Sequence, residues 1–358
     1  MKTNRRASYD PFARGPFPVG VRTIQARDEA RGRTYPCEIW YPATSNHAGQ
    51  DLASTQDSFA FQIPDTNRKQ MAIRDAAAEA GTYPLIAFSH SSGGNRRSAT
   101  FLCTHLSSHG YVVAALDHSE IVAPELARNS NETNDEKTVR QQAWIANRVP
   151  DIRFLLDQLV ARALWNSQAY VDAERIGIVG HSFGGWTALA TPDAEPRIRS
   201  VVTLAPGGSS HPKPGILNVK LGFNWGRDVP TLYLVAENDI SLPLEGMYEL
   251  FGRTPATKRM VILRRADHMH FMDNVEEVHE SLRNMQFTAE LAWISREMRP
   301  IAELCSGEES HLFARGLTLC HMDAVLRQNA DARRFLNGDL ESELAMRGVA
   351  ALVHNPDR

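Results

Sequence analysis

Residues 175–189 read RIGIVGHSFGGWTAL, and this stretch decides the fold. RIGIVG is a short apolar run of the kind buried in parallel sheets, and FGGWTALA has the composition of a helix start. Between them lies the turn Gly180-His181-Ser182-Phe183-Gly184. Small residues on both sides of Ser182 let strand and helix approach closely, so that the serine hydroxyl points out of the sheet edge. The alternative is an ordinary tight turn with an inert serine.

Similar apolar runs recur on both sides of this turn. Two strands are expected at 20–27 and 34–42, and helices at 96–110 and at 149–160, where Pro150 falls in the first turn. Because strands and helices alternate at least five times, we expect an α/β fold with a mostly parallel central sheet and helices on both faces. The buried strands are predicted in PLIAFSH (84–90), YVVAALDH (111–118), VVTLAP (201–206), TLYLVA (231–236) and RMVILR (259–264).

The remaining segments suggest one large domain with short insertions. Residues 1–19 are polar and rich in Pro and Gly, and are expected to form an N-terminal arm. Residues 20–358 are expected to form a single domain, ending in a mostly helical region from Glu280 onward. We predict insertions at 44–82, with a helix over 68–80, at 119–140, which is loop-like, and at 207–228, which is too short for a cap domain and forms a short lid.

Composition excludes several classes of protein. The 358 residues contain 39 Lys and Arg against 42 Asp and Glu, a net charge of −3, which gives no reason to expect nucleic acid as a partner. No apolar run approaches the ~18 residues of a membrane span. The N-terminal residues lack the apolar core of a secretory signal, which favours the cytoplasm, although a chain cut from a longer precursor would look the same. The four cysteines form no Cys-x-x-Cys pair and are expected to be buried thiols, with a Cys305–Cys320 disulfide as the alternative.

A serine nucleophile requires a histidine base and a carboxylate that orients it. In enzymes with this turn the acid and then the histidine follow the serine in the sequence, at the ends of later strands. Asp239, just beyond TLYLVA, is the preferred acid, with Glu237 as the alternative. His268, just beyond RMVILR, is the preferred base, with His270 as the alternative. Two histidines without a third ligand at a suitable spacing do not predict a metal site.

The negative charge that develops on a substrate carbonyl oxygen needs two backbone N–H donors. Phe183, the residue after the nucleophile, supplies one, and Ser92 in the glycine-rich loop after PLIAFSH is expected to supply the other. His118 follows the strand YVVAALD and is expected to line the site or to support it from behind. Phe223 and Trp225 are candidate substrate contacts in the 207–228 insertion, with packing against the core as an equal alternative.

These motifs together resemble the α/β-hydrolase superfamily, and within it the platelet-activating-factor acetylhydrolases and dienelactone-hydrolase-like serine esterases. The resemblance implies that Ser182 is the nucleophile, Asp239 the acid and His268 the base, with Ser92 and Phe183 as oxyanion donors. Ser91 departs from the glycine common in that family. Dienelactone hydrolases proper use cysteine, so Ser182 favours general ester hydrolysis. The resemblance is carried by FSHSSGG, HGYVVAALDH, RIGIVGHSFGG, TLYLVAENDIS and ADHMHFMD, and by the late stretch GLTLCHMDAVLRQNADARRFL.

The sequence therefore predicts a serine esterase acting on small or short-chain carboxylic esters through an acyl-enzyme intermediate. It needs no metal or organic cofactor, and its partner is a small-molecule ester. Activity should fall as His268 gains a proton. An amidase or peptidase using the same triad is the alternative within enzymes, and a catalytically silent binding module on the same fold is the alternative outside them.

Overall fold

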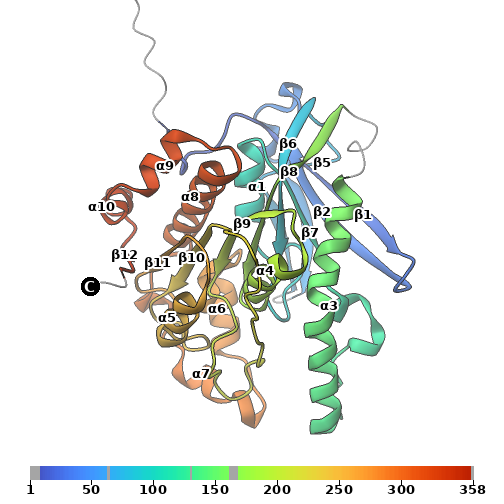
Figure 1. Cartoon of the computed structure of the whole chain (residues 1–358), viewed down its shortest axis with the longest axis vertical. Helices are drawn as coiled ribbons and strands as arrows, with labels where there is room; N and C mark the ends of the chain where they lie inside the picture. Colours follow the sequence, from blue (N-terminus) through green and yellow to red (C-terminus); the bar gives the residue numbers. More distant parts are fainter. Residues whose placement is uncertain (1–8, 63–64, 130, 161–167, 356–358) are drawn as a thin grey trace, which may run out of the picture.

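The computed structural model describes residues 9–62, 65–129, 131–160 and 168–355. Its centre is a ten-stranded sheet with the order β12-β11-β10-β9-β8-β6-β7-β2-β1-β5 (Figure 1). The strands are β1 (Val19–Asp28), β2 (Arg33–Pro42), β5 (Ile73–Arg74), β6 (Gly81–Ser89), β7 (Val112–Leu116), β8 (Ala169–His181), β9 (Ile198–Leu204), β10 (Thr231–Ala236), β11 (Lys258–Leu263) and β12 (Ala351–Val353).

The six strands from β7 to β11 are parallel, as the alternating sequence pattern predicts. β2 runs antiparallel to β7 and to β1 at one side, and β12 runs antiparallel to β11 at the other. Because the side chains of a strand alternate between the two faces of a sheet, β6 contributes side chains to the hydrophobic core on both faces. Leu85 and Ala87 pack in one hydrophobic cluster, and Ile86 and Phe88 pack in the other.

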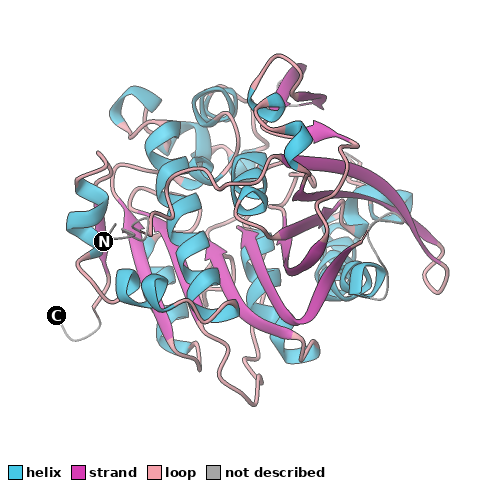
Figure 2. Ribbon diagram, turned by 90° about the horizontal axis from the view of Figure 1, so that it is seen from above, coloured by secondary structure: helices cyan, strands magenta, loops and turns pink. Residues whose placement is uncertain are grey.

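Helices cover both faces of the sheet, as Figure 2 shows. The cluster with Leu85 includes the apolar faces of α3, α4 and α5, and the cluster with Ile86 includes those of α1, α8 and α9. The predicted α/β class is therefore confirmed. The helices are α1 (Thr100–Ser108), α2 (Ser119–Val122), α3 (Asn134–Val160), α4 (Phe183–Ala194), α5 (Leu244–Arg253), α6 (Val275–Arg283), α7 (Trp293–Glu297), α8 (Gly307–Leu326), α9 (Ala330–Leu336) and α10 (Leu340–Ala345).

Two local predictions are wrong. Residues 68–80 are not helical, because β4 (Asp65–Gln70) pairs with β3 (Asp57–Gln62) and β5 pairs with β1. Arg74 is held there by Glu38, at 2.9 Å, and by Asp57, at 2.6 Å, so tertiary contacts override the helix propensity of the alanine-rich segment. The second error concerns the helix predicted over 149–160 and the loop predicted over 119–140. The helix, α3, begins at Asn134 and holds Pro150 in its interior, and the predicted loop contains α2 and the first turns of α3. The exposed side of the helix tolerates Pro150, because water can replace the lost backbone donor.

The N-terminal segment is more firmly attached than a surface arm. Phe12 is buried against α8, where a side chain at Gly316 would overlap its ring. The hydroxyl of Tyr9 donates to Asp323 at 3.0 Å, and the N–H of Gly15 donates to Ser108 Oγ at 3.0 Å. Residues 9–18 therefore lie along α1 and α8, although they form no strand or helix.

Two features of the later chain complete the description. The region after Glu280 is mostly helical, as predicted, but it also contributes β12, which is too short for a sequence pattern to reveal. Among the helices of the described residues, none has the length and apolar character that a membrane crossing requires.

Candidate active site

Ser182 occupies a strained turn between β8 and α4. Its φ of 58° and ψ of −116° are unfavourable for a residue with a side chain, and such strain gathers at functional sites. Gly180 and Gly184 cannot be replaced by larger residues, because a side chain at either position would overlap backbone atoms. A Cβ on Gly180 would lie 1.9 Å from the carbonyl oxygen of Gly184, and one on Gly184 would lie 1.9 Å from that of Ser89. The turn therefore brings the end of β8, the start of α4 and the end of β6 together.

Asp239 and His268 meet beside this turn. Asp239 lies in the loop after β10 and His268 in the loop after β11, and both are buried. Asp239 Oδ2 lies 2.6 Å from His268 Nδ1, while Oδ1 accepts the N–H groups of Ser241 and Leu242, each at 2.8 Å. Glu237, the alternative acid, instead accepts from Arg264 and Arg265. The structure thus brings together the preferred acid and the preferred base.

The charge balance around His268 favours a basic imidazole. Burial disfavours the charged ring, but the nearby carboxylate of Asp239 outweighs it, so the pKa of His268 is raised above its usual value. His181 links the two loops, since its Nε2 lies 3.0 Å from the backbone oxygen of His268. Complete burial, with His268 alongside, holds the pKa of His181 well below its ordinary range, so His181 stays neutral. This contact ties the residue before Ser182 to the backbone of His268.

The two expected oxyanion donors lie on segments that the fold brings together. Phe183 is the first residue of α4, where backbone N–H groups have no partner within the helix. Ser92 is exposed in the loop after β6, and its Oγ lies 3.3 Å from Arg128 Nη2. The neighbouring carbonyl of Ser91 accepts the N–H of Gly94 at 3.1 Å, which closes the turn around Ser92.

Of the three expected substrate contacts, His118 and Trp225 are buried and Phe223 is half-buried. His118 has no exposed surface, and its ring lies 2.9 Å from Ser89 Oγ and 3.1 Å from Asp151 Oδ2. His118 is therefore placed to support the loop after β6 from behind, and not to line an open substrate site. Trp225 is 4% exposed and donates to the carbonyl of Leu189 at 3.2 Å, while Phe223 packs edge-on against it. Packing therefore accounts for Trp225, whereas Phe223 keeps part of its surface exposed.

His270 belongs to a separate buried cluster with Asp267 and His279, whose ligand atoms lie within 4.8 Å of one another. The Nε2 atoms of the two histidines lie 3.0 Å from the carbonyl of Cys305 and 2.8 Å from that of Arg299. Nδ1 of His270 lies 3.0 Å from both the backbone nitrogen and Oδ1 of Asp267, so Asp267 engages this nitrogen in either tautomer and leaves no lone pair free for a metal ion. His279 Nδ1 lies 2.8 Å from Asp267 Oδ2.

Nε2 of His279 faces a carbonyl and Nδ1 lies beside a carboxylate, a setting that favours the doubly protonated, cationic ring. Burial opposes that charge, but the carboxylate of Asp267 raises the pKa of His279 above its usual value. Burial likewise opposes ionisation of Asp267, yet His270 and His279 hold the pKa of Asp267 below its ordinary range. Asp267 also accepts the N–H of Met269 at 2.9 Å, so this pair supports the short helix η5 (His268–Phe271) that begins at the candidate base. Sequence reasoning missed this pair, because His279 lies on α6.

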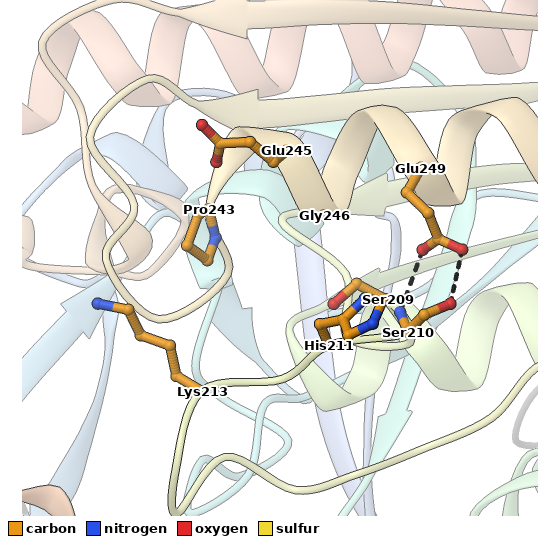
Figure 3. Close-up of a pocket in the computed structure, with 8 residues that line it drawn as sticks. All are labelled: Ser209, Ser210, His211, Lys213, Pro243, Glu245, Gly246 and Glu249. Carbon is orange, nitrogen blue, oxygen red and sulfur yellow. Dashed lines mark hydrogen bonds between the residues drawn. The ribbon is translucent and has the colours of Figure 1, made fainter.

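Residues 284–300 contact two of the three expected insertions, 119–140 and 207–228. The contacts are the ion pairs Lys137–Glu290 at 2.5 Å and Lys213–Glu297 at 2.6 Å. A pocket of about 270 Å³ lies where the 207–228 segment meets α5, and Figure 3 shows Glu249 there, hydrogen-bonded to Ser210. The pocket lining starts at Ser209, two residues after Gly207, whose N–H donates to the carbonyl of Ser182 at 3.0 Å. The pocket is lined by Ser209, Ser210, His211, Lys213, Pro243, Glu245, Gly246 and Glu249.

Comparison with solved structures gives a match that spans the whole arrangement. A ferulic acid esterase from Streptomyces cinnamoneus superposes with a TM-score of 0.62 at 21% identity, covering 90% of this chain and 94% of that one. The chain has the α/β-hydrolase fold. A sequence model described as platelet-activating factor acetylhydrolase, isoform II, matches residues 5–153 of this chain, and one for the prolyl oligopeptidase family matches residues 151–206.

Curated proteins match this chain at 22–25% sequence identity. Cutinase est1 of Thermobifida alba is 25% identical over 243 residues, covering 66% of this chain and 69% of the cutinase. A platelet-activating factor acetylhydrolase of Gallus gallus is 22% identical over 329 residues, covering 74% of each chain. These similarities indicate a carboxylic ester hydrolase.

Proposed function

We propose that this α/β-hydrolase is a serine esterase in which Ser182, His268 and Asp239 form the catalytic triad. The observation that carries the proposal is the 2.6 Å contact between Asp239 Oδ2 and His268 Nδ1, next to a serine on a strained turn. Asp239 fixes the tautomer in which Nδ1 carries the proton, so that Nε2 of His268 is free to accept one from Ser182.

The reaction then follows from the residues in place. His268 takes the proton of Ser182, and Oγ attacks the ester carbonyl. The N–H groups of Ser92 and Phe183 stabilise the oxyanion, and His268 gives its proton to the leaving alcohol. Water, activated by the same histidine, attacks the acyl-enzyme and releases the acid.

We further propose small or short-chain acyl esters as substrates. The pocket between the 207–228 segment and α5 measures about 270 Å³, just below the usual range for ligand sites, and serines, carboxylates and Lys213 line it. Apolar residues around Phe183 and Trp186, including Leu126 and Val219, are largely buried against each other, which leaves little surface for a long acyl chain.

The direct test is hydrolysis of p-nitrophenyl esters from acetyl to dodecanoyl by the wild type, Ser182→Ala and a control, Ser54→Ala. Ser54 is an exposed serine in the loop before β3. Turnover should fall with chain length, vanish in Ser182→Ala and persist in the control. A fluorophosphonate should label the wild type at Ser182. Normal turnover by Ser182→Ala would refute the assignment, and a preference for dodecanoyl esters would refute the proposed acyl size.

An amidase or peptidase with the same triad is the second candidate. The match of the prolyl oligopeptidase model to residues 151–206 favours it, because that segment includes Ser182. p-Nitroanilides with the same acyl groups separate the two proposals. Anilide turnover comparable to that of the esters would favour the amidase, and its absence would favour the esterase.

We also propose a cytoplasmic location and a single domain from residue 20 to the end. All four cysteines are buried and free, which suits a reducing compartment. Burial raises the pKa of Cys37 and of Cys305 to about 12, so these thiols are poor nucleophiles. Cell fractionation tests the location, and limited proteolysis tests the domain, which should resist cleavage as one unit.

A further inference from the structure

Arg148 carries a buried charge that the proposed reaction does not use. Its side chain lies on α3 with no exposed surface, and its guanidinium forms an ion pair with Glu120 of α2. Burying a guanidinium is costly, and one ion pair often fails to recover that cost. Burial lowers the pKa of Arg148, yet an arginine remains protonated. The groups around this charge show what it holds in place.

The guanidinium of Arg148 contacts three consecutive residues at the end of β6. Nη1 donates to the carbonyl of His90 at 2.7 Å and lies 3.3 Å from Ser89 Oγ. Nη2 lies 3.5 Å from the carbonyl of Ser91. That carbonyl also accepts from Nδ1 of His90 at 2.8 Å. Arg148 thus approaches two successive carbonyl oxygens immediately before Ser92.

Because the peptide group is planar, these contacts also restrict the direction in which the N–H of Ser92 points. The carbonyl of Ser91 and the N–H of Ser92 belong to one planar trans peptide, so they point in opposite directions. Donors that hold the Ser91 oxygen on the side of Arg148 therefore direct the Ser92 N–H away from it. The bond to the carbonyl of His90 fixes the preceding peptide in the same way.

The same guanidinium also contacts the residue that carries the other donor. Its central carbon lies 4.1 Å from the centre of the Phe183 ring, a distance at which a cation and an aromatic face attract each other. The Phe183 ring also stacks on Trp186, with 5.4 Å between the ring centres. One buried charge therefore touches the end of β6 and the start of α4, which the chain separates by about ninety residues.

We propose that Arg148, held by Glu120, is a positioning residue that aligns the N–H groups of Ser92 and Phe183 toward the oxyanion. This inference rests on the proposed function, because it presupposes acyl transfer at Ser182. Aligned donors stabilise the transition state more than the bound ester. Loss of alignment therefore lowers kcat and leaves KM nearly unchanged.

The test uses two mild variants, since complete removal of Arg148 endangers folding. Arg148→Lys keeps the charge but loses the forked donor, and Glu120→Gln keeps the shape but loses the ion pair. The readouts are kcat and KM for p-nitrophenyl butyrate, and Ki for a trifluoromethyl ketone, whose adduct places an oxyanion between the donors. We expect kcat to fall about tenfold to a hundredfold, less than the 10²–10³ that loss of a donor costs. Ki should rise by a similar factor.

Arg327 provides a matched control at the opposite end of the sheet. It pairs with Asp323 at 3.0 Å, donates to the carbonyl of Gly110 at 2.7 Å and lies 4.0 Å from the centre of the Tyr111 ring. Arg327→Lys should lower Tm without changing kcat or Ki. The midpoint of the pH–rate curve should stay the same in every variant, because the inference leaves His268 unchanged.

Two outcomes would overturn the inference, and they are distinguishable. If Arg148→Lys and Glu120→Gln lower Tm but leave kcat and Ki as they are in Arg327→Lys, the pair is structural only. If the wild type neither hydrolyses the ester nor accepts a fluorophosphonate at Ser182, the proposed function fails and the inference fails with it.

Discussion

Replacing Asp239 with Asn should remove most activity without unfolding the protein. Oδ1 of Asp239 accepts two backbone N–H groups, from Ser241 and Leu242, so the oxygen of an asparagine must occupy that position. Its NH₂ group then faces Nδ1 of His268, which lies 2.6 Å from Oδ2 in the wild type. Nδ1 becomes an acceptor, the proton moves to Nε2, and His268 can no longer take the proton of Ser182. The same inversion in a serine protease costs about 10⁴ in kcat, and we expect about 10³–10⁴ here.

The assay is p-nitrophenyl butyrate hydrolysis from pH 5 to 9, with Tm as a check of folding. Since the carboxylate of Asp239 raises the pKa of His268, wild-type activity should rise with pH through a midpoint above the ordinary value of about 6.5. In Asp239→Asn the midpoint of any residual activity should shift to lower pH. The control is Glu237→Gln, which removes the same charge beside Arg264 and should change kcat by no more than about twofold. A loss below about tenfold in Asp239→Asn, or an equal loss in the control, would refute this account of the triad.

Two further predictions follow from the packing around the site. Gly184→Ala should destabilise the protein by about 1–3 kcal/mol and reduce activity, because the new Cβ would lie 1.9 Å from the Ser89 carbonyl oxygen. Gly252→Ala on α5, where a Cβ would meet no atom within 4 Å, should instead stabilise the protein by about 0.5–1 kcal/mol. Thermal unfolding that shows a change of the same sign for both variants would contradict this prediction. His279→Gln should cost about 1.5–3 kcal/mol at pH 6. Because folding raises the pKa of His279, the stability that its charge contributes is full below about pH 6.5 and is lost as the pH rises through the folded pKa. The Tm values of the wild type and of His279→Gln should therefore converge toward pH 9. A difference in Tm that stays constant with pH would show that the charge of His279 does not contribute to stability.

The sequence was sufficient to predict the sheet, because each parallel strand is buried on both faces and therefore reads as a continuous apolar run. β6 and β10 were predicted in this way, and the turn at Ser182 followed from its glycines. The pattern failed where long-range pairs decide the structure. Arg74 lies in strand β5, where ion pairs with Glu38 and Asp57 hold it. Strand β12 has only three residues. No local periodicity carries that information.

The same limit applies to the site. Acid and base candidates could be proposed because each follows a recognisable strand. Arg148, by contrast, acts on His90, 58 residues earlier in the chain, and His279 acts on Asp267 from another helix. An arginine inside a helix sequence reads as a solvated residue, and only its complete burial shows otherwise. The contact of residues 284–300 with the other two segments was missed for the same reason, since exposed ion pairs leave no pattern in the sequence.

The central claim is that Ser182 is acylated during turnover. Intact-mass analysis of the protein, quenched soon after mixing with p-nitrophenyl acetate and followed by peptide mapping, tests it directly. The account predicts one acetyl group on Ser182 of the wild type, a larger acetylated fraction at early times than after substrate exhaustion, and none in Ser182→Ala. An acetyl group that turns over on another residue, or equal acetylation of Ser182→Ala, would contradict it.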